Sequence, residues 1–408
     1  MKKFKIVTLG CRTNQYESQG YADQLRAMGY TAAAEEERAD VCIVNTCTVT
    51  ESADSSSRLK IRQLLREHPG AKVAVTGCMA ERAPQAILGL GEGIQVVPNG
   101  RKEKLIEELF PEEQEWPEFR IQEFDGHTRA FVKVQDGCNS FCTYCIIPYV
   151  RGRSRSRPIA EVVEEVRGLV ANGYKEVVIT GINVGDFDAG GKLVDLVRAV
   201  DAVEGLKRLR ISSIDPDEVD LELERAVLEG KNTCPSMHIV LQAGSNVVLK
   251  RMNRKYTRQI FLETIERLKK AEPNFTVTTD VIVGFPGETE ADFEETLDVV
   301  RQVRFAKIHV FPYSPRDRTR AALYPNQVPK PVIEERKQRL LRLAEQTAFE
   351  LRQEFVGRTM EVLLEEGNEG HTTNFLKVLV QGDAHQKNEL VRCFLEENTP
   401  EGLKGRPV

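Results

Sequence analysis

Three closely spaced cysteines are the residues whose type and spacing most directly predict chemistry in this chain. Cys138, Cys142 and Cys145 form a C-x3-C-x2-C loop directly after a strand-like segment. Thiolates are the usual ligands of iron-sulfur clusters, and a cubane cluster held by only three of them keeps one iron without a protein ligand. Because a small molecule can bind that open iron, the loop predicts chemistry rather than electron storage alone.

A structural zinc site is the alternative interpretation of these cysteines. Such a site needs a closed tetrahedral set of four ligands. The next cysteine, Cys234, lies far along the chain, and the nearest histidine, His127, precedes the loop at a spacing outside the usual zinc patterns. The spacing therefore favours an iron-sulfur cluster over zinc.

A second set of cysteines, Cys11, Cys47 and Cys78, lies at the ends of strand-like runs. These runs cover residues 4–10, 40–44 and 72–75. Helical patterns over 15–28 and 52–68 separate them, which predicts an alternating domain with a parallel sheet. The carboxyl ends of parallel strands share one edge, so the three thiols would converge there. A small buried thiol near a strand end is also common in ordinary packing, and the residues alone leave both interpretations open.

The remaining cysteines give weaker signals. Cys42 lies inside an apolar run and is expected to pack in the core, while Cys234 and Cys393 have no partner at ligand spacing and are expected to be structural or incidental. Disulfides are rare in the reducing cytosol, where we expect this protein to act, so we expect metal ligands or free thiols among the nine cysteines.

Composition limits the class of protein. The chain has 408 residues, of which 41% are hydrophobic and 29% are charged, and no stretch is apolar enough to cross a bilayer. That length accommodates two or three domains and predicts a cytoplasmic protein without a membrane partner. The net charge of -5 argues against a uniformly basic nucleic-acid surface, although a local basic surface remains possible.

The segment after the cysteine loop repeats a strand-helix rhythm. Strands are predicted at 130–135, 176–180, 209–214, 237–241, 276–283 and 307–311. About six such units are fewer than the eight of a closed barrel, which predicts an open, partial barrel. A long amphipathic helix over 331–355 follows, and then short strands at 359–364, 375–380 and 389–394 predict a small all-β module.

These elements predict an α/β protein of three parts. Residues 1–115 are expected to form a parallel-sheet α/β domain, residues 124–355 a partial (β/α)6 barrel, and residues 356–408 a small C-terminal all-β domain. The acidic stretch 111–119 is expected to link the first two domains.

Taken together, these features resemble the radical S-adenosylmethionine (SAM) methylthiotransferases, and the similarity extends over essentially the whole chain. The segments 9–18, 76–78 and 147–158 resemble the branch of that family that modifies threonylcarbamoyladenosine beside the tRNA anticodon. Ala243 stands where the family often has serine, which puts no role in doubt. The C-terminal domain resembles the RNA-binding TRAM module of the family only in position and texture.

The resemblance implies two 4Fe-4S clusters with different tasks. Cys138, Cys142 and Cys145 would hold the cluster that binds SAM and generates a deoxyadenosyl radical, and Cys11, Cys47 and Cys78 would hold an auxiliary cluster where sulfur is methylated before its transfer. The expected SAM-binding residues lie mainly on turns that follow barrel strands: Tyr144, Gly181, Asn183, Ser213, Gln242 and Val283. No acid-base dyad stands out as catalytic.

The resemblance also implies a reaction and its partners. The expected function is insertion of a methylthio group at C2 of N6-threonylcarbamoyladenosine in tRNA, with the anticodon stem-loop, an electron donor and a sulfur donor as partners. The sister branches give two alternatives, isopentenyladenosine in tRNA and an aspartate of a ribosomal protein. A non-catalytic RNA-binding protein with structural zinc is the alternative of another class.

A run of four arginines follows the cysteine loop. Arg151, Arg153, Arg155 and Arg157 could form an ordinary solvated face, but their place beside the reactive loop predicts contact with RNA phosphates. Base recognition in a single-stranded loop also needs stacking partners, and Phe141, Tyr144 and Tyr149 are close in sequence.

Overall fold

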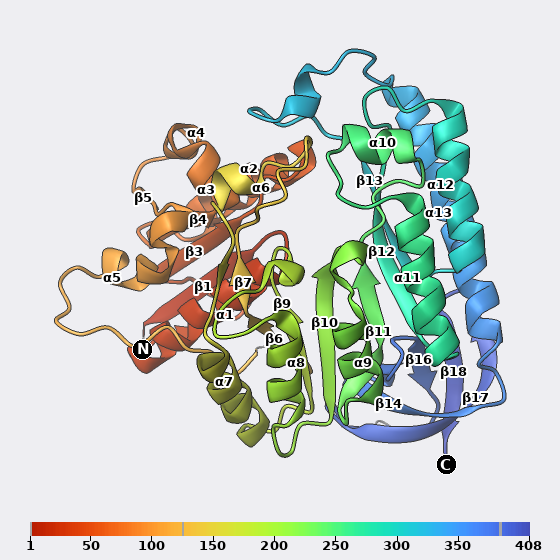
Figure 1. The fold of residues 1–408 in the computed structure, drawn as a ribbon. Coiled ribbons are helices and arrows are strands. Elements are labelled where there is room, and N and C mark those ends of the chain that lie inside the picture. The colour runs from red at the N-terminus through yellow and green to blue at the C-terminus, as the bar shows by residue number, and fades with distance from the viewer. Residues whose placement is uncertain (1, 125, 383–385) are drawn as a thin grey trace.

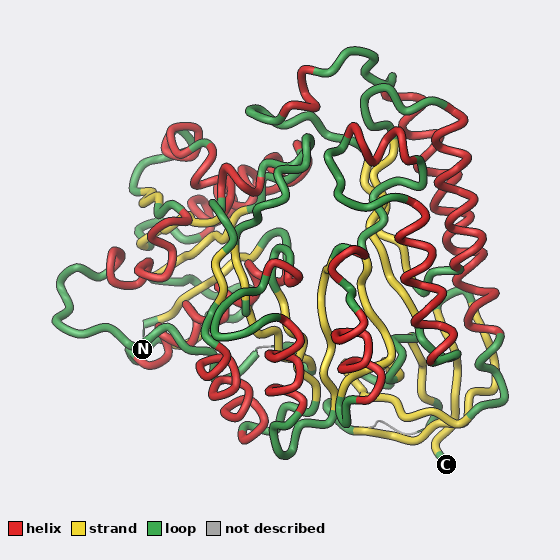
Figure 2. The backbone as a smooth tube through the Cα atoms, viewed as in Figure 1, coloured by secondary structure: helices red, strands yellow, loops and turns green. Residues whose placement is uncertain are grey.

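The computed structural model describes residues 2–124, 126–382 and 386–408, which form two parallel sheets and a small barrel (Figure 1). The N-terminal sheet lies beside the central sheet, and the C-terminal barrel lies at the opposite end of the central strands from their arrowheads. Helices cover the outer side of the central sheet, as the backbone trace shows (Figure 2). The predicted α/β class with a partial barrel and a C-terminal β-domain is confirmed.

The N-terminal sheet has five parallel strands in the order β2-β1-β3-β4-β5. The strands are β1 Lys3–Thr8, β2 Thr31–Ala32, β3 Val41–Thr46, β4 Lys72–Gly77 and β5 Ile94–Val96. The α-helices of this part are α1 Arg12–Ala27, α2 Glu51–Glu67, α3 Cys78–Arg82, α4 Pro84–Leu88 and α5 Leu105–Leu109. Every residue of β3 is buried, as expected for a central parallel strand with helices on both faces. Cys42 is part of this core, as predicted.

The central sheet has six strands in the order β13-β12-β11-β10-β9-β6, and all neighbours are parallel. The strands are β6 Arg129–Lys133, β9 Glu176–Thr180, β10 Arg208–Ile214, β11 Thr233–Ile239, β12 Thr276–Val283 and β13 Lys307–Pro312. Their helices are α7 Ile159–Ala171, α8 Leu193–Asp201, α9 Leu221–Glu229, α10 Asn246–Arg251, α11 Arg258–Ala271, α12 Glu290–Val303 and α13 Lys330–Gln353. Because this sheet has two edges, it is an open half-barrel.

Alternation along β12 separates the two faces of the half-barrel. Val277, Val281 and Val283 pack in the core beneath the helices, because successive side chains of a strand point to opposite faces. Thr278 lines a pocket on the other face, the lumen, and Asp280 lies on that same face two residues on. The lumen is therefore the polar side of the sheet.

The C-terminal barrel is closed in the order β14-β15-β16-β18-β17. Its strands are β14 Thr359–Glu366, β15 Glu369–Thr372, β16 Lys377–Val380, β17 Leu390–Thr399 and β18 Gly402–Pro407. The sequence predicted three of these strands and missed β15 and β18, which are short or contain glycine and proline and so carry little strand propensity.

Two buried arginines of β10 attach this barrel to the half-barrel. Arg208 donates to the carbonyls of His371 and Glu361 at 2.8 and 2.9 Å. Arg210 donates to the carbonyls of Thr372 and Thr373 at 2.9 and 2.8 Å. The β15–β16 hairpin therefore closes the amino-terminal end of the lumen.

The predicted linker runs along α1. The amide of Gln24 donates to the carbonyl of Pro117 at 2.6 Å, and the ring of Phe119 packs edge-on against Tyr21. Among the described helices, none is both long and apolar enough to cross a membrane. The predicted domain limits at 115, 124 and 356 remain predictions.

Candidate functional site

The structure places Cys11, Cys47 and Cys78 at one edge of the N-terminal sheet. They follow β1, β3 and β4, which are neighbours in that sheet, so their loops emerge side by side. The three thiols interact electrostatically with one another, and Cys47 and Cys78 are buried while Cys11 is exposed. The convergence expected from strand order is thus present in the fold.

Backbone geometry brings these loops unusually close together. Gly10 has φ +98°, and a Cβ on it would lie 2.9 Å from Sγ of Cys47, so a side chain there would displace the thiol. Asn14 holds the same loops, because its amide donates to the carbonyls of Leu9 at 2.6 Å and Thr46 at 3.1 Å. The cradle is therefore built from backbone and one asparagine.

A buried ionic network supports this edge from the side of the half-barrel. Glu17 of α1 accepts from Arg151 at 3.1 Å and pairs with Lys102 at 2.7 Å and Lys133 at 3.4 Å. Asp136 pairs with Arg151 at 2.8 Å and also with Lys102. These buried groups comprise three cations and two carboxylates, so the network has a net charge of one positive unit.

Arg151 directs that charge at the thiols. It interacts electrostatically with Cys78 and Cys11, and its Nε is buried without a hydrogen-bond partner in the described chain. Burial raises the pKa of Cys78, and Arg151 opposes that rise. Burial also raises the pKa of Cys47 to about 12, a cost that coordination to a metal would remove. The donor set therefore fits a thiolate-ligated metal centre.

The second thiol site is the loop of Cys138, Cys142 and Cys145, which follows β6 and the short strand β7 Gln135–Asp136. β7 pairs with β8 Arg155–Ser156, and the amide of Cys138 donates to the carbonyl of Gly152 at 3.1 Å. On its other side the loop is tied to the end of α10, since the amide of Thr143 donates to the carbonyl of Met252 at 3.0 Å. The loop is thus anchored at both ends.

One cation contacts a thiol of this loop directly. Arg254 donates to Sγ of Cys142 at 3.0 Å and also pairs with Asp215. Burial raises the pKa of Cys145, and the neighbouring Cys142 adds to the rise. A hydrogen bond to a ligand sulfur is one of the factors that set the reduction potential of an iron-sulfur cluster.

The two thiol sites lie against one apolar cluster. The cluster is built at the short helix α6 Ile147–Val150, where Ile146, Ile147 and Val150 pack with Cys78. Cys138 and Cys145 pack against the same group. Neither thiol set forms a group whose ligand atoms all lie within 4.8 Å, as a single bound ion requires, among the residues that the structure describes. Cysteines that bind different irons of one cluster stand farther apart than the ligands of a single ion, so this arrangement is compatible with a cluster.

The expected SAM-binding residues lie on the rim beside this loop. Gly181 and Asn183 follow β9, Ser213 lies near the end of β10, Gln242 follows β11, and Val283 ends β12. Those strands are neighbours in the sheet, and Tyr144 lies within the cysteine loop and packs against Phe285. Their common location agrees with a ligand-binding face at the carboxyl ends of the strands, while their contact with SAM remains a prediction.

The arginine run divides in two. Arg151 is buried in the ionic network, so the prediction that it contacts phosphate is wrong. Arg157 is half-buried and donates to Tyr16 and Glu165 at 2.9 and 2.8 Å, which leaves little of it for RNA. Arg153 and Arg155 are exposed, and Arg153 lies over the ring of Phe141 at 4.3 Å.

Sequence reasoning missed three charged residues at the site. Arg254 and Glu218 lie beyond the motifs, and Arg151 was assigned another role. Burial and the nearby Asp215 raise the pKa of Glu218 to about 7, and its carboxylate accepts from Asn183 at 3.0 Å. Each of these residues is recognised only by the partner that it meets in the folded protein. Because that partner is distant in the sequence, no local pattern reveals the residue.

Comparison with known proteins first defines the class. The sequence profile of the radical SAM superfamily matches residues 132–300, and that of an uncharacterized protein family, UPF0004, matches residues 3–98. The chain also superposes on a radical SAM methyltransferase, TsrM of Kitasatospora setae, with a TM-score of 0.57 at 15% identity over 79% of this chain and 75% of that one. The superposition on the cobalamin-dependent SAM radical enzyme OxsB has a TM-score of 0.53 at 10% identity, and it covers 86% of this chain and 58% of that one. The central half-barrel is thus that of a radical SAM enzyme, a class that uses SAM and a 4Fe-4S cluster.

Relatives in sequence define the family. The chain is 48% identical to the threonylcarbamoyladenosine tRNA methylthiotransferase MtaB of Chlamydia pneumoniae, over 99% of this chain and 98% of the relative. It is 38% identical to the protein of that name from Bacillus subtilis, over 94% and 92%. A tRNA-2-methylthio-N(6)-dimethylallyladenosine synthase of Desulfitobacterium hafniense is 36% identical over 96% and 95%. The chain belongs to the radical SAM methylthiotransferase family, which sets aside the alternative of a non-catalytic zinc protein.

The ionic network predicts a specific dependence of stability on pH. Burial alone would raise the pKa of Glu17, but Arg151, Lys102 and Lys133 outweigh it and lower the pKa to about 2. Because the unfolded pKa is about 4.3, the stabilisation by Glu17 is fully present above that pH and is lost as the pH falls through the lowered folded pKa. Glu17→Gln should therefore lower stability at pH 7 and flatten the acid limb of the stability profile.

Fluorescence of Trp116, the one tryptophan of the sequence, can follow this unfolding, because its indole donates to the carbonyl of Phe110 in the N-terminal core. Glu112→Gln is the matched control, since Glu112 forms an exposed pair with Lys72. Equal acid profiles for Glu17→Gln and the unsubstituted protein would contradict the assigned role of the network.

Proposed function

We propose that this enzyme inserts a methylthio group at C2 of N6-threonylcarbamoyladenosine in the anticodon loop of tRNA. The observation that carries the proposal is the pair of thiol triads on two different sheets, packed against one apolar cluster. Support for the substrate comes from MtaB relatives of two organisms, whose name states that nucleoside. We expect the enzyme to act in the cytoplasm, where tRNA is found.

Each thiol site has a separate task in this proposal. Cys138, Cys142 and Cys145 would hold the 4Fe-4S cluster common to radical SAM enzymes, and Cys11, Cys47 and Cys78 would hold an auxiliary 4Fe-4S cluster. When bound, the first cluster would pass one electron from an outside donor to SAM, and the auxiliary cluster would hold the sulfur before its transfer. The electron and sulfur donors are separate partners.

The chain itself supplies position, charge and exclusion of water. Arg254 donates to Cys142 and Arg151 faces Cys78, so each triad has one buried cation that stabilises negative charge on sulfur. Ile146, Ile147 and Val150 keep the space between the triads apolar. Tyr144, Gly181, Asn183, Ser213, Gln242 and Val283 would hold SAM at the rim, so that a target carbon can be fixed between the two sites.

The first experiment separates the two cysteine sets. Anaerobically reconstituted protein should bind about eight irons, and alanine at Cys138, Cys142 and Cys145 should halve that number and abolish deoxyadenosine formation. Alanine at Cys11, Cys47 and Cys78 should also halve the iron, yet retain deoxyadenosine formation and lose the methylthio product. Cys42→Ala is the control, because this core thiol should leave iron and product unchanged. Methylthio product from the second triple variant would refute the division of tasks.

The second experiment identifies the nucleoside. The purified enzyme should methylthiolate an anticodon stem-loop that carries threonylcarbamoyladenosine, and mass spectrometry of tRNA from a deletion strain should show loss of 2-methylthio-threonylcarbamoyladenosine. The sister reactions provide the contrary results: loss of the isopentenyl nucleoside, or of a methylthio group on a ribosomal protein, would reject this substrate and keep the chemistry.

The third experiment tests the RNA surface. Replacement of the exposed Arg153 and Arg155 by glutamine should weaken tRNA binding and reduce the slope of log Kd against log salt by about one unit per lost phosphate contact. Arg62 and Arg66 are exposed arginines of α2, and their replacement by glutamine makes the matched control. An unchanged slope in the Arg153 and Arg155 variant, measured by fluorescence anisotropy, would exclude these two residues from the interface.

A further inference from the structure

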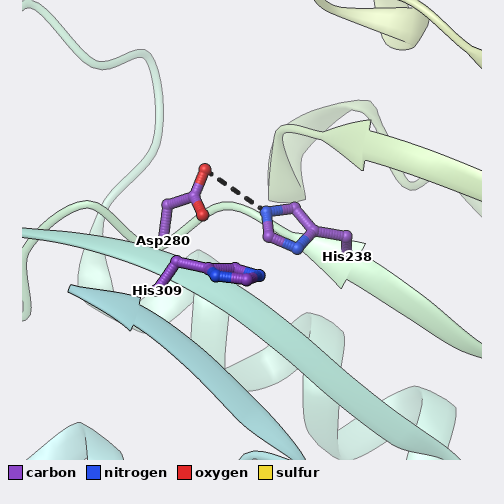
Figure 3. A group of neighbouring side chains, drawn as sticks. All are labelled: His238, Asp280 and His309. Carbon is purple, nitrogen blue, oxygen red and sulfur yellow. Dashed lines mark ion pairs between the residues drawn. The ribbon is translucent and has the colours of Figure 1, made fainter. Parts of the chain in front are cut away.

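The lumen of the half-barrel contains a polar group that neither the thiol sites nor the rim accounts for. His238 of β11, Asp280 of β12 and His309 of β13 lie on adjacent strands, with one ligand atom of each within 4.8 Å of the others (Figure 3). Nε2 of His238 is 3.4 Å from a carboxylate oxygen of Asp280, and Asp280 is in register with His309. In the view of Figure 3 the three side chains point toward one another.

Arg12 enters the same lumen from the N-terminal domain. It begins α1, directly after Cys11, and its guanidinium lies 5.3 Å from the ring centre of Phe131 on β6. It lines a pocket together with His238, and it interacts electrostatically with both Asp280 and His309. Within the described ranges, this guanidinium makes no hydrogen bond or ion pair with the protein. Loss of water and the nearby Arg129 and Arg210 lower the pKa of Arg12 to about 10.

The other two arginines of this pocket are already committed. Arg129 pairs with Glu365 at 3.0 Å, and Arg210 pairs with Glu176 at 2.7 Å and donates to the C-terminal barrel. Both also lie over the ring of Phe375, which closes the lumen from below. Arg12 is therefore the cation that remains available for a ligand in this pocket.

The charge of the lumen decides which ligand suits it. Two histidines and an aspartate could hold a divalent cation, but Arg129 and Arg210 are balanced by Glu365 and Glu176, and a cation at this group would have to bind close to the positive charge of Arg12. An anion is favoured instead, because a partly buried guanidinium without a protein partner gains most from a carboxylate, which it can bind through two parallel hydrogen bonds.

We propose that Arg12 and His309, together with His238 and Asp280, bind the threonylcarbamoyl arm of the substrate, and that Arg12 pairs with the carboxylate of that arm. The inference rests on the proposed function and names the residues that select the nucleoside. The arm carries a carboxylate, a hydroxyl and urea N–H groups. Arg12 and the imidazoles can donate to the carboxylate, and Asp280 can accept from the hydroxyl and the N–H groups.

The same residues would reject the substrate of the sister branch. A dimethylallyl arm has no hydrogen-bonding group, so its entry would remove water from Arg12 and give it no partner in return. Sites built to pair a polar group discriminate strongly against an analogue that lacks it. The position of Arg12 also suits this role, because Arg12 adjoins Cys11 in the chain. On the adenine ring only N1 and C6 separate C2 from the nitrogen that carries the arm. A base with C2 near the auxiliary site can thus place its arm in the lumen.

The test compares two anticodon stem-loops, one with threonylcarbamoyladenosine and one in which the carboxylate is replaced by a carboxamide. The unsubstituted enzyme should prefer the carboxylate. Arg12→Gln should lower kcat/KM for the carboxylate substrate by about 10- to 100-fold and change that for the carboxamide much less, as expected for a lost charged hydrogen bond. Arg12→Lys should restore part of the preference because it keeps the charge.

Arg12 adjoins a cluster ligand, so loss of the cluster must be separated from loss of substrate binding. The iron content and the absorption spectrum of the reconstituted protein must therefore match in all variants. His309→Gln supplies a second test on a strand remote from Cys11 in sequence, and it should reduce the preference in the same direction. Arg62→Gln is the matched control for loss of one arginine from the N-terminal domain.

The possible failures are distinguishable. If the unsubstituted enzyme modifies dimethylallyladenosine instead, the proposed function fails. If it modifies the threonylcarbamoyl substrate but Arg12→Gln and His309→Gln retain the full preference for the carboxylate, only the present inference fails. Stoichiometric zinc or manganese binding by a chain without the six cluster cysteines, abolished by His309→Gln, would also overturn it, since the lumen would then be a cation site.

Discussion

The buried network of Glu17, Arg151, Asp136, Lys102 and Lys133 is the interaction on which the arrangement of this enzyme depends. Its members come from α1, from β6 and β7, and from the segments beside α5 and α6, so it joins the N-terminal sheet to the half-barrel. Opposite charges that are buried together are costly to separate, because removal of one leaves its partner without water. The network therefore fixes the distance between two thiol sites that belong to different sheets.

That constraint explains why the space between the sites is apolar. α6 is only one turn long, yet Ile146, Ile147 and Val150 pack with Cys78, and Cys138 and Cys145 pack against the same group. Arg151 follows directly and brings its charge to the auxiliary thiols. One short segment thus contacts both sites, makes their shared surroundings apolar and supplies a counter-charge to one of them, so a shift of α6 would alter all three properties together.

The sequence predicted those parts of the structure that depend on local patterns. Alternation of strands and helices gave the two parallel sheets, and strand order then placed Cys11, Cys47 and Cys78 at one edge. Long-range pairing was not accessible in this way. Nothing local distinguishes Arg151, whose partner Glu17 is 134 residues away, from the exposed Arg153 two positions later. Arg254 beside Cys142 was missed for the same reason, since only the folded chain provides its partner, whereas β15 and β18 were missed because they carry little strand propensity.

The division between rim and lumen accounts for how one family can modify different nucleosides. In the proposed reaction the rim and the two thiol sites act at C2, which is the same atom in every adenosine, so these parts are not needed to tell the substrates apart. The N6 arm is what distinguishes the substrates, and a carboxylate differs from an alkyl group chiefly in charge. Selectivity therefore requires a charge placed away from the reacting carbon. Arg12 meets this requirement, because it begins at the auxiliary site but presents its guanidinium to the lumen beside Phe131.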